Sequence, residues 1–244
     1  MARQNAKGLV IGTVGPVSFR VLEGRQILQS KPGKGNMKQS KATKATAFDF
    51  GNASWLSKKI RIALSPLLLG FTDSKMYYRF TALIYRHSVK NITLDSLENP
   101  ENDAFLQENY FECNFNSPFV EYCKLQPLIK LDTDGNVVVS LPEFHTSEKF
   151  RFPDSASTAV FCLLATVINP EDGSETWADV LKFSITDLNT VIPAQQWEIP
   201  AIAKNQWLVL TAAVLYYKND RFIGNVGMSS KDFHPCAVIG LWKS

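Results

Sequence analysis

The second half of the chain, from Tyr110 onward, limits the fold most strongly, because it consists of short apolar runs separated by turn residues. The runs are rich in β-branched and aromatic residues, which favour strands. Asp134-Gly135, Asp172-Gly173 and Asn219-Asp220 are typical turn pairs between such strands. The strands are predicted over Leu125–Leu131, Val137–Leu141, Thr158–Ile168, Trp177–Ile185, Gln195–Ile199, Trp207–Tyr217, Phe222–Val226 and Ala237–Trp242.

Strands at this spacing predict an antiparallel β-sandwich of immunoglobulin-like shape. The lack of β-α-β alternation excludes Rossmann and TIM-barrel folds. Cys162, Trp177 and Cys236 follow the Cys, Trp, Cys order of immunoglobulin domains, although His234 stands where those domains carry a tyrosine. The four cysteines lack zinc-site spacing, and we expect them to be reduced and buried.

Near the N-terminus, residues 13–32 predict a β-hairpin, because apolar and polar residues alternate and Glu23-Gly24 supplies a turn. A two-stranded hairpin is only marginally stable alone. We therefore expect it to pack on another surface, such as a second copy of the chain. The apolar side chains expected to make this assembly contact are Val17, Phe19, Val21, Ile27 and Leu28.

Between the hairpin and the strands, apolar residues recur at three- and four-residue steps, as in amphipathic helices. A first helix is predicted from about Gln39, and it ends before Pro66. A second helix should begin at a cap near Asp73 and run to about Val89. A short helix is also predicted at Asn102–Gln107.

These elements predict an α+β protein with two parts. A basic hairpin-plus-helices region is expected over residues 1–109, and a β-sandwich domain over residues 110–244. The formal net charge of +3 hides an asymmetry, since residues 1–62 hold twelve Lys and Arg against two carboxylates. The remaining residues hold fourteen Lys and Arg against 21 Asp and Glu.

The basic N-terminal residues are candidates for contact with a polyanion, because Lys and Arg that neutralise phosphates release counterions. Only Phe19 is available among them to stack on bases, so specific base contact has little support. The alternatives are a solvated face or a surface that docks on the acidic part of a neighbouring copy. The residues concerned are Arg20, Arg25, Lys31, Lys34, Lys38, Lys41 and Lys44.

Known catalytic and metal-binding signatures are missing from the sequence. There is no G-x-S-x-G elbow and no H-E-x-x-H motif, and His87, His145 and His234 are far apart. The segment 132–136 fits a hairpin turn better than a calcium loop, and Gly33-Lys34-Gly35 does not match a phosphate-binding loop. We therefore expect no enzymatic activity, no cofactor and no metal.

No apolar run approaches the ~18 residues that a transmembrane helix needs. Residues 1–8 are polar and basic without the apolar segment of a signal peptide, so synthesis in the cytoplasm is expected.

Two stretches resemble the N-terminal signature of an uncharacterised protein family widespread in Bacteroidota. The first runs from Gly12-Thr13-Val14-Gly15-Pro16-Val17 to Ser30-Lys31-Pro32, and the second from Lys38-Gln39-Ser40 to Ala53-Ser54. The resemblance covers about the first 65 residues clearly. It implies a hairpin, then helices, then a β-sandwich domain, and it implies no activity.

Taken together, the sequence favours a non-enzymatic structural or assembly protein that associates with itself through the hairpin, as in a phage or phage-derived particle. A β-sandwich module that binds carbohydrate or peptide is the first alternative, with Trp177, Trp197, Trp207 or Trp242 stacking on a sugar. Nucleic-acid contact through the basic region is the second.

Overall fold

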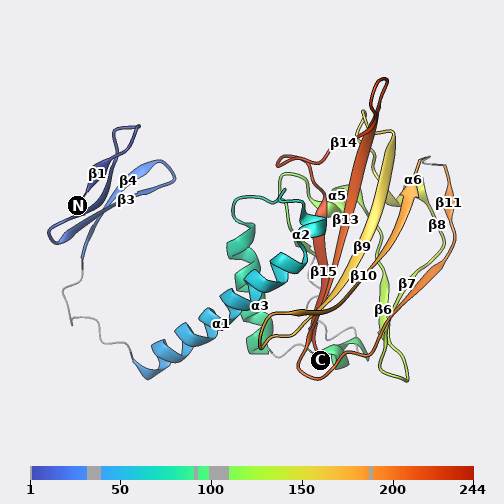
Figure 1. The fold of residues 1–244 in the computed structure, drawn as a ribbon, viewed down its shortest axis with the longest axis horizontal. Helices are drawn as coiled ribbons and strands as arrows, with labels where there is room; N and C mark the ends of the chain where they lie inside the picture. The colour runs from blue at the N-terminus through green and yellow to red at the C-terminus, as the bar shows by residue number, and fades with distance from the viewer. Residues whose placement is uncertain (1, 32–39, 91–92, 99–109, 187–188) are drawn as a thin grey trace. The chain divides into compact units, whose positions relative to one another are not determined.

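The computed structural model describes residues 2–31, 40–90, 93–98, 110–186 and 189–244 (Figure 1). The helix predicted at Asn102–Gln107 and the basic residues Lys34 and Lys38 lie outside these ranges. The chain divides into two compact units, Met1–Phe48 and Asp49–Ser244.

The first unit contains a four-stranded antiparallel sheet in the order β1-β2-β3-β4. Its strands span Arg3–Gln4, Val10–Val14, Val17–Leu22 and Arg25–Ser30. Glu23 and Gly24 both have positive φ, at 50° and 78°, which suits the two-residue turn of a right-twisted hairpin. The predicted hairpin is confirmed as β3 and β4, and a further turn at Gly15-Pro16 adds β2 to it.

Helix α1, Lys41–Ala63, begins in the first unit and ends in the second. Its residues 41–52 are exposed, and burial begins at Ala53. Helix α2, Ser65–Leu68, carries Pro66 in its first turn. Proline lacks a backbone N–H, and N–H groups in the first turn make no hydrogen bond within the helix, so proline is tolerated there. The predicted break before Pro66 is therefore confirmed, with α1 ending at Ala63.

Helix α3, Met76–Lys90, begins just after Asp73, as predicted. The Asp73 carboxylate accepts the Lys75 backbone N–H at 2.9 Å and pairs with Arg79 one turn into the helix. A short 3-10 helix, η1, follows at Leu94–Glu98.

The large sheet of the second unit has the strand order β10-β9-β13-β15-β5, with β14 paired to β13, and every neighbouring pair is antiparallel. The strands are β5 Phe111–Glu112, β9 Thr158–Ile168, β10 Glu175–Ile185, β13 Trp207–Asp220, β14 Gly224–Gly227 and β15 Cys236–Lys243.

A smaller antiparallel sheet has the order β12-β7-β6, and β8 and β11 form a separate pair. Two helices of one turn each, α5 and α6, lie in the connections. These elements are α5 Phe119–Tyr122, β6 Leu128–Leu131, β7 Val137–Leu141, β8 Phe144–His145, α6 Thr146–Lys149, β11 Val191–Ile192 and β12 Gln195–Ile199.

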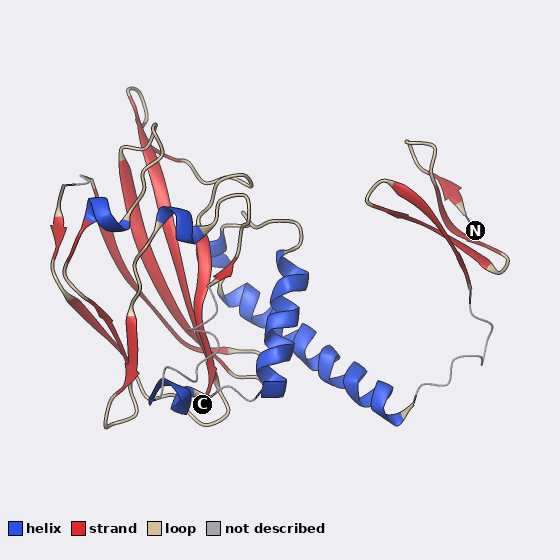
Figure 2. Ribbon diagram, turned by 180° about the vertical axis from the view of Figure 1, so that it is seen from behind, coloured by secondary structure: helices blue, strands red, loops and turns tan. Residues whose placement is uncertain are grey.

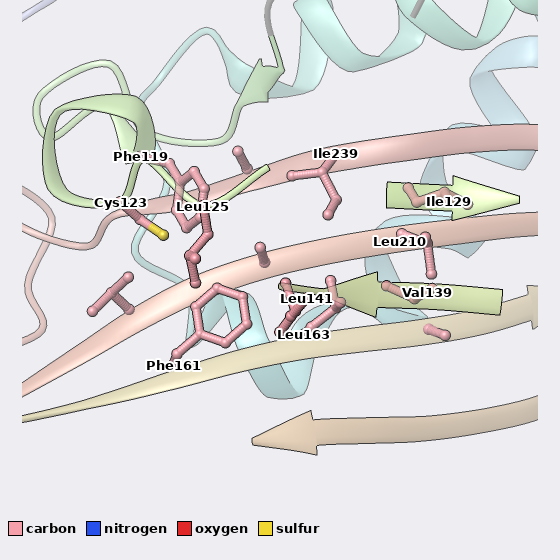
Figure 3. Close-up of a cluster of buried hydrophobic side chains, with 14 of the residues drawn as sticks. Phe119, Cys123, Leu125, Ile129, Val139, Leu141, Phe161, Leu163, Leu210 and Ile239 are labelled. Atoms are coloured by element: carbon pink, nitrogen blue, oxygen red, sulfur yellow. The ribbon is translucent and has the colours of Figure 1, made fainter. Parts of the chain in front are cut away.

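One face of the large sheet shares a buried core with the smaller sheet (Figure 3). Phe161, Leu163 and Leu210 of the large sheet lie in the same cluster as Val139 and Leu141 of the smaller sheet. Because apolar side chains from both sheets fill one interior, the two sheets form a sandwich-like pair of layers.

The opposite face of the large sheet is covered by helices α1 and α3 (Figure 2). Ile60 of α1 and Phe80 of α3 are fully buried in one cluster with Val209 and Leu241 of the sheet. The helices therefore belong to the same folding unit as the strands. The predicted division into 1–109 and 110–244 differs from the observed one, because a shared core joins these helices to the sheet.

The strand predictions are accurate where turn residues or prolines closely bound the run: β7, β9 and β12 match their predicted bounds. Strand β13 is longer than predicted, since it continues to Asp220 and the hairpin turns at residues 221–223. The Asp220 side chain accepts the Phe222 N–H at 2.9 Å and thereby stabilises that turn.

Cys162 and Cys236 lie in the same sheet, in register with Ala213 on the strand between them. Two strand spacings separate their backbones by roughly 9–10 Å, which is beyond disulfide reach. All four cysteines are free and buried, as expected. They do not form the bridge between two sheets that the immunoglobulin pattern would require.

Candidate functional site

The N-terminal sheet has one face without charged side chains in its strands. Strand register places Phe19 opposite Leu28, Val17 opposite Val14, and Val21 opposite Gln26. Paired residues point to the same side of a sheet, so these apolar side chains share one surface. We call it the uncharged face, and its apolar residues are Val10, Val14, Val17, Phe19, Val21 and Leu28.

The opposite face carries the charges. Arg3 pairs with Ile11, Arg20 pairs with Ile27, and Arg25 pairs with Leu22. We call this surface the basic face. Four of the five predicted assembly residues lie on the uncharged face. The grouping of Ile27 with them is wrong, because Ile27 and Leu28 are neighbours in β4 and so point to opposite faces, which places Ile27 on the basic face.

The uncharged face is only partly covered within the described part of the first unit. The Gln26 side-chain amide accepts the Val10 backbone N–H at 2.8 Å and donates to the Val10 carbonyl at 2.7 Å, and Val17, Phe19 and Val21 are half-buried. No side chain among residues 2–31 and 40–48 is buried.

Val14 is 57% exposed and Leu28 is 63% exposed on this face, which also carries the polar Gln26 and Ser30. Leu22, on the basic face, is also 63% exposed. A sheet of this size without a buried side is not expected to be stable without a partner.

The predicted basic residues that the structure describes come from different elements. Arg20 and Arg25 lie on the sheet, and Lys31 follows the end of β4. Lys41 and Lys44 are exposed in the first turns of α1.

The second unit contains a groove with a volume of about 930 Å³ on its helix side. Helix α1 contributes Trp55 and α3 contributes Tyr85, while the turn between β9 and β10 contributes Glu171. The groove is also lined by Asn205, which precedes β13, and by Lys243 in β15. Segments far apart in sequence therefore meet at this groove, which sequence periodicity alone could not show.

Two contacts fix the walls of the groove. The aliphatic chain of Lys59 in α1 lies against Gly173, so closely that a Cβ at Gly173 would be 2.4 Å from Lys59 Cγ. The Lys59 ammonium lies 5.5 Å from the centre of the Trp55 ring. Trp55 is consequently held in place at the surface, where 38% of it remains exposed.

The tryptophans predicted to meet a ligand are mostly structural. Trp207 and Trp242 are buried, and Trp207 lines the inner side of the groove. Trp177 is half-buried against the sandwich core. Trp197 is also half-buried, and its indole N–H donates to Asp179 at 3.1 Å. Trp55, which the helical pattern assigned to an apolar stripe, is the one beside the groove that keeps substantial exposure.

Of the histidines, His145 is exposed and His87 is buried on α3. His234, in the loop before β15, is fully buried. Its Nε2–H donates to the Leu67 carbonyl at 2.9 Å, its Nδ1 lies 3.2 Å from the Ser229 hydroxyl, and burial lowers its pKa. These bonds join the loop before β15 to α2, which is a structural role.

Buried titratable groups elsewhere also have structural roles. The Glu112 carboxylate accepts the Phe119 and Val120 backbone N–H groups at 2.6 and 3.2 Å, and burial raises its pKa. The Asp132 side chain accepts the N–H groups of Asp134 and Asn136, which confirms the hairpin turn. Across the described residues, no group of three His, Cys, Asp or Glu side chains could hold a metal ion.

Comparison with known proteins finds no family model, curated protein or solved structure that matches the chain. Within the part of the chain that the structure describes, no helix has the length and apolar character needed to cross a membrane.

Proposed function

We propose that the protein associates with itself through the uncharged face of its N-terminal sheet. The observation that carries this proposal is the exposure of that face, seen in Val14 and Leu28, on a sheet with no buried residue. Burying a leucine or phenylalanine side chain contributes about 1.5–3 kcal/mol, so covering the face would stabilise the sheet and the contact together.

The separation of charge supports a second copy as the partner. Two copies of a basic segment repel each other where their charges meet. The strand charges of this sheet, Arg3, Arg20 and Arg25, all lie on the basic face. Two uncharged faces can therefore pack on each other with the charges directed outward, as in an interface with two-fold symmetry.

Leu28 and Ile27 provide a matched test, because they are neighbours in β4 and point to opposite faces. Leu28→Ser should convert the oligomer of the full chain to a monomer in analytical ultracentrifugation. Ile27→Ser should leave the oligomer intact. The proposal fails if both variants keep the wild-type mass, or if Ile27→Ser dissociates the oligomer and Leu28→Ser does not.

This assembly role is proposed as non-enzymatic, in a phage or phage-derived particle made in the cytoplasm. Membership of the Bacteroidota family rests on the N-terminal motif, which includes the Gly15-Pro16 turn and Lys31-Pro32. The immunoglobulin-like arrangement of the sandwich stays a prediction, and the positions of Cys162 and Cys236 in one sheet do not favour it.

A second candidate function is nucleic-acid contact through the basic face. It is supported by the alignment of Arg3, Arg20 and Arg25 on one side of the sheet. Retention on immobilised DNA or RNA should then fall steeply with salt, and Arg20→Gln with Arg25→Gln should reduce that slope. Retention that is weak and independent of salt would reject this role.

A further inference from the structure

The groove on the helix side of the second unit is independent of the N-terminal sheet, since all its lining residues lie between Asp49 and Lys243. We propose that this groove binds a neutral oligosaccharide. Its volume of about 930 Å³ lies near the upper end of the range for small-molecule sites. This size suits several linked sugar rings better than one small polar metabolite.

The aromatic side chains of the groove provide flat apolar surfaces. Trp55 is 38% exposed beside the groove, with Lys59 over its ring. Tyr85 is positioned by Phe50, whose ring centre lies 6.0 Å away. Rigid aromatic rings offer contact area at low entropic cost, and the C–H face of a sugar ring matches such a surface.

The polar side chains match hydroxyl groups. Asn52 and Asn205 each present an amide that can donate and accept, and Asp49 and Glu171 present acceptors. A sugar hydroxyl also donates and accepts, so adjacent hydroxyls can pair with this mixture. The lining holds two carboxylates, Asp49 and Glu171, and one lysine, Lys243, so there is no excess of positive charge, which disfavours a phosphate or another polyanion.

The polar wall is held in place before any ligand arrives. Asn205 adopts the left-handed region with φ of +67°, a conformation that asparagine accepts more readily than other residues with a side chain. Its N–H donates to the Ser244 carbonyl at 2.9 Å, and the Ser244 N–H donates to Gln206 at 2.8 Å. The C-terminus thus fixes the loop that presents the Asn205 amide, as a preorganised binding site requires.

The test is isothermal titration calorimetry of the full chain with five probes: cellohexaose, xylohexaose, mannohexaose, maltohexaose and chitohexaose. Binding of at least one probe is expected, and Trp55→Ala should weaken it about tenfold or more. Asn205→Gly should also weaken it. Because glycine accepts the positive φ, Asn205→Gly removes the side-chain amide without straining the loop. If Trp55→Ala does not fold, Asn205→Gly alone tests the proposal.

Trp197→Phe is the matched control, because Trp197 is partly exposed but lies outside the groove. This variant should bind the same probe with wild-type affinity. The proposal is overturned if no probe binds at millimolar concentration, or if both groove variants bind as tightly as wild type. Binding of a heparin hexasaccharide or a neutral hexapeptide in preference to all five probes would also overturn it.

Discussion

Replacing Ile60 by alanine tests whether helix α1 and the large sheet fold as one unit. Ile60 is fully buried in the cluster that joins α1 and α3 to β13 and β15. Truncating a buried isoleucine to alanine costs about 2–5 kcal/mol, because it removes apolar contacts and leaves a cavity. In a unit of this size each kcal/mol lowers Tm by roughly 2–4 °C, so a loss of about 4–20 °C is expected.

Ile62→Ala is the matched control, since Ile62 lies on the same helix but is 58% exposed. Its removal should change the free energy of unfolding by less than about 0.5 kcal/mol, because alanine also has the better helix propensity. Urea unfolding followed by tryptophan fluorescence reports on both elements, because Trp207 and Trp242 are buried in the sheet and Trp55 lies on α1. The reasoning is refuted if Ile60→Ala leaves that transition unchanged, or if the helix unfolds in a separate transition.

Three further predictions concern stability. The Thr211 hydroxyl is buried without a hydrogen-bond partner, so Thr211→Val should raise the free energy of unfolding by about 1 kcal/mol in urea titrations, and a decrease would contradict this. Burial lowers the pKa of His234, so as pH falls below about 6.5 the imidazole is protonated in the unfolded chain before it is protonated in the folded one. The free energy of unfolding should therefore decline on acidification, and it should decline less in His234→Gln. Equal declines in the two proteins would count against this role of His234. Gly173 and Gly135 both have positive φ, but only Gly173 lies against Lys59. In thermal unfolding, Gly135→Ala should lower the free energy of unfolding by about 1 kcal/mol, and Gly173→Ala should lower it by more. Equal losses in the two variants would argue against the contact with Lys59.

Strand positions could be predicted from the sequence where turn residues bound a short apolar, β-branched run. Thr158–Ile168 and Val137–Leu141 are bounded by turn residues, and both strands match their predicted bounds. The helix break near Pro66 follows from proline chemistry in the same way. These features depend on neighbours in the chain, so a local pattern is sufficient to find them.

Features that depend on distant residues could not be predicted in this way. The burial of His234 depends on a bond to Leu67, and the two residues are far apart in sequence. Grouping Ile27 with Leu28 overlooks that neighbouring strand residues point to opposite faces, and the register against β3 shows that Leu28 is the one that shares a face with Phe19. The groove needs α1, α3 and the turn at Glu171 together, and no local motif marks such a meeting point. The left-handed Asn205 gave no recognisable signal either, since asparagine is common in loops.

Sedimentation equilibrium of the unmodified full chain over a range of concentrations tests self-association most directly. An exposed apolar sheet face without strand charges predicts a mass that rises to a multiple of 27.3 kDa as concentration increases. A mass that stays at 27.3 kDa at every concentration would contradict the proposed assembly role.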